Sequence, residues 1–91
     1  MSRRRNYNDD SLNVMRRYFN AFDTLRENGK IKSITAYCDK YHIDKRHFYE
    51  QRRDLYKGHF QVGWLHTIIR DYGISPLWLL MGEGEMSLSI E

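Results

Sequence analysis

Residues 33–56 read SITAYCDKYHIDKRHFYEQRRDLY and contain two short helical patterns that only His42 and Ile43 separate. The first pattern places apolar or small side chains on one helical face, at Ile34, Tyr37, Cys38 and Tyr41. The second begins at Asp44, a residue type that caps helix N-termini, and turns Phe48 and Leu55 inward. Helices joined by so short a turn must cross at a steep angle, so the spacing predicts a helix-turn-helix pair.

The outward face of the second predicted helix, residues 44–55, carries a dense set of hydrogen-bonding side chains. Arg and Lys pair with guanine and Gln with adenine, and the first residues of a recognition helix reach base edges. We therefore predict that this helix enters a DNA major groove; the alternative is a merely solvated helix face. The predicted base-reading residues are Lys45, Arg46, Tyr49, Glu50, Gln51 and Arg53.

A further set of side chains is predicted to contact DNA phosphates. Ser33 and Thr35 open the first helix, where backbone N–H groups and the helix dipole favour phosphate. Arg52 is expected either to contact a phosphate or to pair with an acidic side chain. Residues 1–9 are predicted to be a flexible basic arm that reaches phosphates or a minor groove, or else a solvated tail. The full set is Arg3, Arg4, Arg5, Lys30, Lys32, Ser33, Thr35, His47 and Arg52.

Two longer helices are predicted on either side of this pair. Residues 10–28 carry an apolar stripe at helical spacing and end at Gly29, which can take the left-handed conformation of a helix stop. We interpret that stripe as core, because aromatic side chains at this spacing pack far more often than they bind a ligand. Residues 61–72 form a second such pattern, with Trp64 expected at the edge of its apolar face.

A short fifth helix, residues 77–81, is predicted because Ser75-Pro76 is a strong start signal and Gly82 is a stop. Residues 84–91 alternate apolar and polar side chains and are expected to form a frayed tail or a short extended segment. With 91 residues, the chain is predicted to be one all-α domain in which the helix-turn-helix pair provides helices 2 and 3.

Charge is distributed unevenly along the chain, whose formal net charge is +3. Residues 1–57 hold 14 of the 15 basic and 8 of the 12 acidic side chains, whereas residues 58–91 carry a net charge of −3. The basic part contains the predicted helix-turn-helix pair, as expected if that part faces phosphates. An ordinary mixed surface is the alternative interpretation.

Cysteine usage and hydropathy disfavour several classes of function. The single cysteine, Cys38, excludes an internal disulfide and a zinc site built on several thiols, and it fits a reducing, cytoplasmic compartment. No stretch is long and apolar enough to span a membrane, and the three N-terminal arginines lack the apolar run of a signal peptide. His42 lies four residues after Cys38, but that thiol occupies a small, buried helix position. We expect no enzyme activity, metal, cofactor or small-molecule substrate.

The helix order and two stretches of sequence resemble the phage repressor and Cro family of DNA-binding domains, the lambda repressor-like fold. The small Cys38, the apolar Tyr41 and Ile43 beside the turn, and the anchor Phe48 carry the first likeness. Residues 72–86, YGISPLWLLMGEGEM, are similar to the ending Tyr-Gly-Val-Ser-Pro-x-Trp-Leu-Leu-Thr-Gly-Glu-Gly of many such domains.

Three positions depart from the pattern of that family. His42 stands where the turn usually has glycine, so it is expected to hold a strained, positive φ. Met81 replaces the usual threonine or serine before the glycine that ends the fifth helix. The loop over residues 53–61 differs from the most regular members, which leaves the position of the fourth helix open.

The resemblance implies a sequence-specific double-stranded DNA-binding transcriptional regulator, a repressor of a phage-like or mobile element. The alternatives are a protein-interaction module or antitoxin-like partner that keeps the fold, and a non-specific nucleic-acid binder. Because operators are usually read by symmetric dimers, we expect a homodimer. The alternative is that Trp78 belongs to the core and the tail is frayed, in which case no dimer surface is formed by helix 77–81 and the tail. The predicted dimer interface consists of Trp78, Met81, Met86, Leu88 and Ile90.

Overall fold

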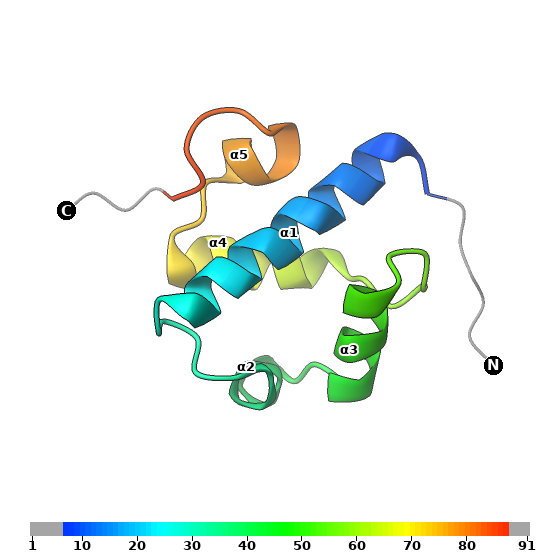
Figure 1. Cartoon of the computed structure of the whole chain (residues 1–91), viewed down its shortest axis with the longest axis vertical. Helices are drawn as coiled ribbons and strands as arrows, with labels where there is room; N and C mark the ends of the chain where they lie inside the picture. The colour runs from blue at the N-terminus through cyan, green and yellow to red at the C-terminus, as the bar shows by residue number, and fades with distance from the viewer. Residues whose placement is uncertain (1–6, 88–91) are drawn as a thin grey trace.

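The computed structural model describes residues 7–87, and within this range the chain folds into five α-helices. They are α1 (Asp9–Glu27), α2 (Ile34–Tyr41), α3 (Lys45–Arg53), α4 (Val62–Tyr72) and α5 (Pro76–Met81). Figure 1 shows α1 crossing the middle of the molecule, with α2 and α3 below it and α5 above. The predicted all-α class is confirmed, since the described residues contain no sheet and only an isolated antiparallel bridge between Ile74 and Ser87.

The helices begin at the caps that the sequence predicts in three of five cases. The side chains of Ser33, Asp44 and Ser75 each accept a hydrogen bond from a backbone N–H in the first turn of α2, α3 and α5. Helix α1 is capped instead by Asn8, whose Oδ1 accepts from the Ser11 N–H at 2.8 Å. Asparagine satisfies a first-turn donor as well as aspartate or serine does. The helix therefore begins at Asp9, one residue before the predicted start.

Aromatic side chains fill the core between the helices. Phe48 of α3 is completely buried, and its ring centroid lies 5.0 Å from that of Phe22 in α1 and 5.3 Å from that of Trp64 in α4. Trp64 is only 5% exposed, so the expectation that it lies at an edge was wrong. The reason is tertiary: Phe60, from the loop before α4, packs edge-on against it at 5.0 Å and closes the core.

A chain of hydroxyl groups ties α1, α2 and α4 together inside the core. The Tyr37 hydroxyl lies 2.7 Å from the Tyr18 hydroxyl and 2.7 Å from Thr67 Oγ1. Thr67 donates its single proton to the Trp64 carbonyl at 2.8 Å, so Tyr37 must donate to Thr67, and Tyr18 to Tyr37. Burial raises the pKa of both tyrosines, which therefore remain neutral donors.

The turn between α2 and α3 takes the conformation that the sequence predicts. His42 has φ 58° and ψ 42°, in the left-handed region, and among the non-glycine residues described it alone has a positive φ. Its N–H donates to the Cys38 carbonyl, which closes the end of α2. Figure 1 views α2 almost along its axis while α3 lies across the view, so the two helices are steeply inclined to each other.

The C-terminal part is held against α1 by an arginine. Arg17 donates from Nε to the Leu79 carbonyl at 2.8 Å and from Nη2 to the Leu80 carbonyl at 3.0 Å, at the end of α5 where carbonyls lack helical partners. The chain beyond α5 then returns, and the Ser75 N–H donates to the Met86 carbonyl at 2.8 Å. None of the helices in residues 7–87 has the length and apolar character needed to cross a membrane.

Candidate nucleic-acid interface

Four of the six predicted base-reading side chains share the exposed face of α3. Lys45, Arg46, Tyr49 and Arg53 are all exposed, and Tyr49 keeps 46% of its surface in contact with solvent. Lys45 and Arg46 stand in the first turn because the Asp44 carboxylate accepts from the Arg46 and His47 N–H groups and fixes the start of the helix. These backbone hydrogen bonds, that of His47 first, lower the pKa of Asp44. The cap therefore stays ionised and in place at neutral pH.

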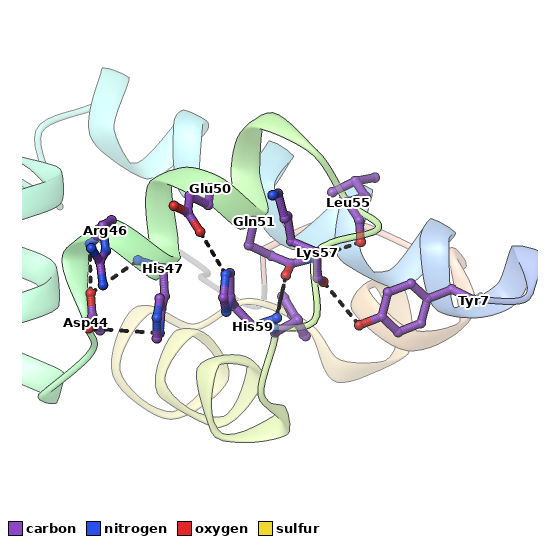
Figure 2. A network of polar contacts seen from close by, with 10 residues as sticks. Tyr7, Asp44, Arg46, His47, Glu50, Gln51, Leu55, Lys57 and His59 are labelled. Carbon is purple, nitrogen blue, oxygen red and sulfur yellow. Dashed lines mark hydrogen bonds and ion pairs between the residues drawn. The ribbon is translucent and has the colours of Figure 1, made fainter. Parts of the chain in front are cut away.

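Gln51, the fifth predicted base reader, is in the interior, so that prediction was wrong. Its side chain is 0% exposed. Its Nε2 donates to the Leu55 carbonyl at 2.8 Å, and its Oε1 accepts from the N–H groups of His59 and Phe60 at 2.9 and 3.1 Å (Figure 2). A buried amide with this many partners cannot also present its edge to a base. Gln51 instead fixes the loop between α3 and α4.

This anchorage also explains why α3 is shorter than predicted. The helix ends at Arg53, and Asp54 follows in extended conformation with φ −140°. Gln51 takes the Leu55 carbonyl, and the Asp54 side chain accepts from the Tyr56 N–H at 3.0 Å. These local hydrogen bonds replace the next helical ones, so the chain leaves the helix and crosses toward α4.

Glu50, the sixth predicted base reader, is directed toward the loop. Its Oε1 lies 2.9 Å from Nε2 of His59, and this hydrogen bond is the main cause that lowers the pKa of Glu50. The His59 ring stacks on the His47 ring, with centroids 4.0 Å apart and planes inclined by 4° (Figure 2). From the sequence, no role is predicted for His59. No spacing rule signals its role, because His59 lies nine residues from its carboxylate partner.

The first turn of α2 lies beside the first residue of α3. Lys45 Nζ donates to Thr35 Oγ1 at 3.3 Å, so the N-termini of both helices meet at one surface. Thr35 is exposed there, and Lys30 and Lys32 are exposed in the segment before α2. Ser33 is half-buried, and its hydroxyl oxygen accepts from the Ala36 N–H at 3.0 Å. Two helix N-termini and Lys45 bring positive charge to this surface, beside the exposed Asp44 carboxylate that caps α3.

Arg52 follows the second of the two expectations stated for it. Its guanidinium pairs with the Asp23 carboxylate of α1, on the side of α3 that faces the rest of the protein. This ion pair joins α3 to α1, so Arg52 is not assigned to the phosphate contacts. His47 keeps a half-exposed ring, which is stacked on His59. The predictions for Arg3, Arg4 and Arg5 fall outside the described residues.

The predicted dimer surface is only partly available on the described residues. Trp78 and Met86 are partly buried and pack against the core, which leaves Met81, at 64% exposed, as the accessible member. Helix α5 also exposes Leu77 and Leu80, at 52% and 47%, which the sequence did not single out. The predictions for Leu88 and Ile90 fall outside the described residues.

Cys38 has the environment of a packing residue. It is 1% exposed, and burial raises the pKa of its thiol to about 11, so the thiol stays protonated at neutral pH. In the part of the chain from 7 to 87, no cluster of three or more His, Cys, Asp or Glu side chains is arranged to hold a metal ion. Comparisons with protein families, curated proteins and solved structures find no match to this chain.

Proposed function

We propose that this protein is a sequence-specific double-stranded DNA-binding transcriptional regulator, a repressor with a lambda repressor-like arrangement, that inserts α3 into the major groove. The observation that carries the proposal is the exposed face of α3, which presents Lys45, Arg46, Tyr49 and Arg53 together. Within residues 7–87, none of the three basic side chains among them forms an ion pair. A helix of this width fits a major groove, and its side chains then face base edges.

In this mechanism, positioning and base reading are divided between two helices. Thr35 in the first turn of α2, with Lys30 and Lys32 just before that helix, contacts the phosphates beside the groove and sets the register without reading sequence. Lys45 and Arg46 reach guanine edges from the first turn of α3. Lys45 Nζ lies 3.3 Å from Thr35 Oγ1, so the proposed phosphate-contacting and base-reading side chains adjoin at this point.

Symmetric pairing through α5 completes the proposal. Leu77, Leu80 and Met81 form an exposed apolar face, and a second copy docked there would give the symmetric dimer that reads two half-sites. The same apolar face favours a second candidate function, a protein-interaction module or antitoxin-like partner. In that case α5 binds a different protein and α3 has no operator.

The test is selection of bound duplexes from a random pool, with the mass of the selected complex measured alongside. A repressor enriches one sequence, as an inverted repeat if the bound form is a dimer. Arg46→Ala should then weaken binding to that sequence by about 1–3 kcal/mol and relax one base position. Arg16→Ala, which removes an equal charge from an exposed position on α1, is the matched control and should change binding to all sequences equally and slightly.

The outcomes separate the candidates. Binding that falls with salt but selects no sequence indicates a non-specific nucleic-acid binder. Absence of duplex binding at low salt excludes both DNA proposals and leaves the protein-interaction module. Unchanged selectivity in Arg46→Ala shows that Arg46 does not read a base.

A further inference from the structure

A carboxylate beside the predicted recognition surface is held by a residue outside the recognition helix. Glu50 follows Arg46 by four positions and precedes Arg53 by three, so on α3 it is a neighbour of both arginines. Arg46 already acts on Glu50 through its charge, and Lys57 does so from the loop. Without another partner, the Glu50 side chain would pair with these arginines on the surface that faces the groove.

The partner that prevents this is His59. Its Nε2 lies 2.9 Å from Glu50 Oε1, and because a carboxylate only accepts, the proton of this hydrogen bond is on Nε2. The His59 side chain is 16% exposed and that of Glu50 is 26% exposed, so solvent competes only partly for the contact. Figure 2 shows the carboxylate pointing down from α3 to the imidazole.

The position of His59 is itself fixed by two contacts of different kinds. The His59 N–H donates to the buried Gln51 Oε1 at 2.9 Å, which sets the backbone. The imidazole stacks on His47 at 4.0 Å between centroids, which sets the ring. Because both the backbone and the ring of His59 are held in place, its Nε2 has a fixed position beside the Glu50 carboxylate.

We propose that His59 is a specificity-determining positioning residue, which keeps the Glu50 carboxylate away from Arg46 and Arg53 and out of the DNA groove. This inference rests on the proposed DNA-binding function. A freed carboxylate would act in two ways: it would compete with DNA for the arginines, and it would repel phosphates or accept from a cytosine amino group. Either effect changes which duplexes bind and how tightly.

The experiment is a double-mutant cycle on binding to the duplex that the wild-type protein selects. His59→Phe keeps a flat ring against His47 but cannot bind Glu50, and we expect it to lower affinity by about fivefold or more and to shift base preference. Glu50→Gln in the same chain removes the freed charge, so the double variant should return to within about twofold of wild type. A purely structural role for His59 would not be rescued at Glu50.

Two further measurements keep the inference open to refutation if His59→Phe is poorly folded. His59→Gln retains a donor near the place of Nε2 and should keep wild-type affinity and preference. Carbon NMR of the Glu50 carboxyl group without DNA should show its lowered pKa rising in His59→Phe.

Two kinds of failure can be told apart. If wild type selects a duplex but His59→Phe binds it unchanged, or Glu50→Gln fails to rescue, the role of His59 is wrong and the proposed function stands. If wild type selects no duplex, the proposed function fails and this inference fails with it.

Discussion

Replacing Gln51 with leucine is expected to destabilise the protein strongly, although both residues have similar size. The change leaves three backbone groups without their partner: the Leu55 carbonyl and the N–H groups of His59 and Phe60. A buried polar group left unpaired costs about 1–3 kcal/mol. The three loop residues are partly exposed, so water can replace part of the loss, and we expect about 2–4 kcal/mol in total.

Urea denaturation followed by circular dichroism measures this loss, and it is large beside the roughly 5–15 kcal/mol that usually stabilises a domain. Hydrogen exchange of the His59 and Phe60 amides should accelerate in Gln51→Leu more than exchange in α1, because the loop is released first. Arg53→Ala, on the exposed face of the same helix, is the matched control and should change stability by less than about 0.5 kcal/mol.

A Gln51→Leu variant as stable as the Arg53→Ala control, with unchanged exchange at His59 and Phe60, would show that Gln51 does not hold the loop. Weakened DNA binding at full stability would be equally damaging, since that is the behaviour of a base reader. It would restore the interpretation of Gln51 that the sequence favoured.

Three other perturbations test separate parts of the structure. Tyr37→Phe should lower the free energy of unfolding, measured with heat or urea, by about 1–3 kcal/mol, because the buried Tyr18 hydroxyl loses its acceptor. Tyr18→Phe should cost less, because Tyr37 still donates to Thr67. His42→Gly should raise the free energy of unfolding by up to about 1 kcal/mol, because relief of about 1–2 kcal/mol of left-handed strain exceeds the roughly 0.5–1 kcal/mol that glycine adds in unfolded-chain entropy. A loss of stability would show that the strain at His42 is smaller than this entropy. Hydrogen bonds from Arg70, and then from Tyr41, hold the pKa of Asp71 well below its ordinary value. Ionised Asp71 therefore stabilises the folded state fully above the unfolded-state pKa of about 3.9. This stabilisation is lost as the pH falls through the lower folded-state pKa. The difference in urea stability between wild type and Asp71→Asn should therefore be present at pH 7 and shrink in acid, and a difference that grows in acid would contradict this sign.

Local signals in the sequence were sufficient for most of the fold. Helix starts at Ser33, Asp44 and Ser75 follow from short-range hydrogen bonds between a side chain and its own first turn. The left-handed turn at His42 follows from the two residues available to reverse the chain. These features depend on neighbours within a few positions, so they can be predicted without knowing where the rest of the chain lies.

The candidate site could be predicted only in part, because the sequence shows which side chains are polar but not whether each one points to solvent or to the core. Lys45, Arg46, Tyr49 and Arg53 face solvent as expected, but the polar Gln51 faces the core. On a nine-residue helix with only one fully buried aromatic side chain, the boundary between inward and outward positions is poorly marked by hydrophobicity. The loop residues that decide it lie four to nine positions further along the chain.

By itself, therefore, the sequence determined an all-α chain, the caps of α2, α3 and α5, and the turn that joins α2 to α3, because each of these depends on local geometry and apolar spacing. Tertiary structure alone decided which side chains remain free on α3. The loop before α4 folds back and occupies the hydrogen-bonding groups of Gln51 and Glu50, while Asp23 of α1 takes Arg52. Such pairings join residues eight or more positions apart, beyond the reach of helical spacing, and no local pattern in the sequence specifies them.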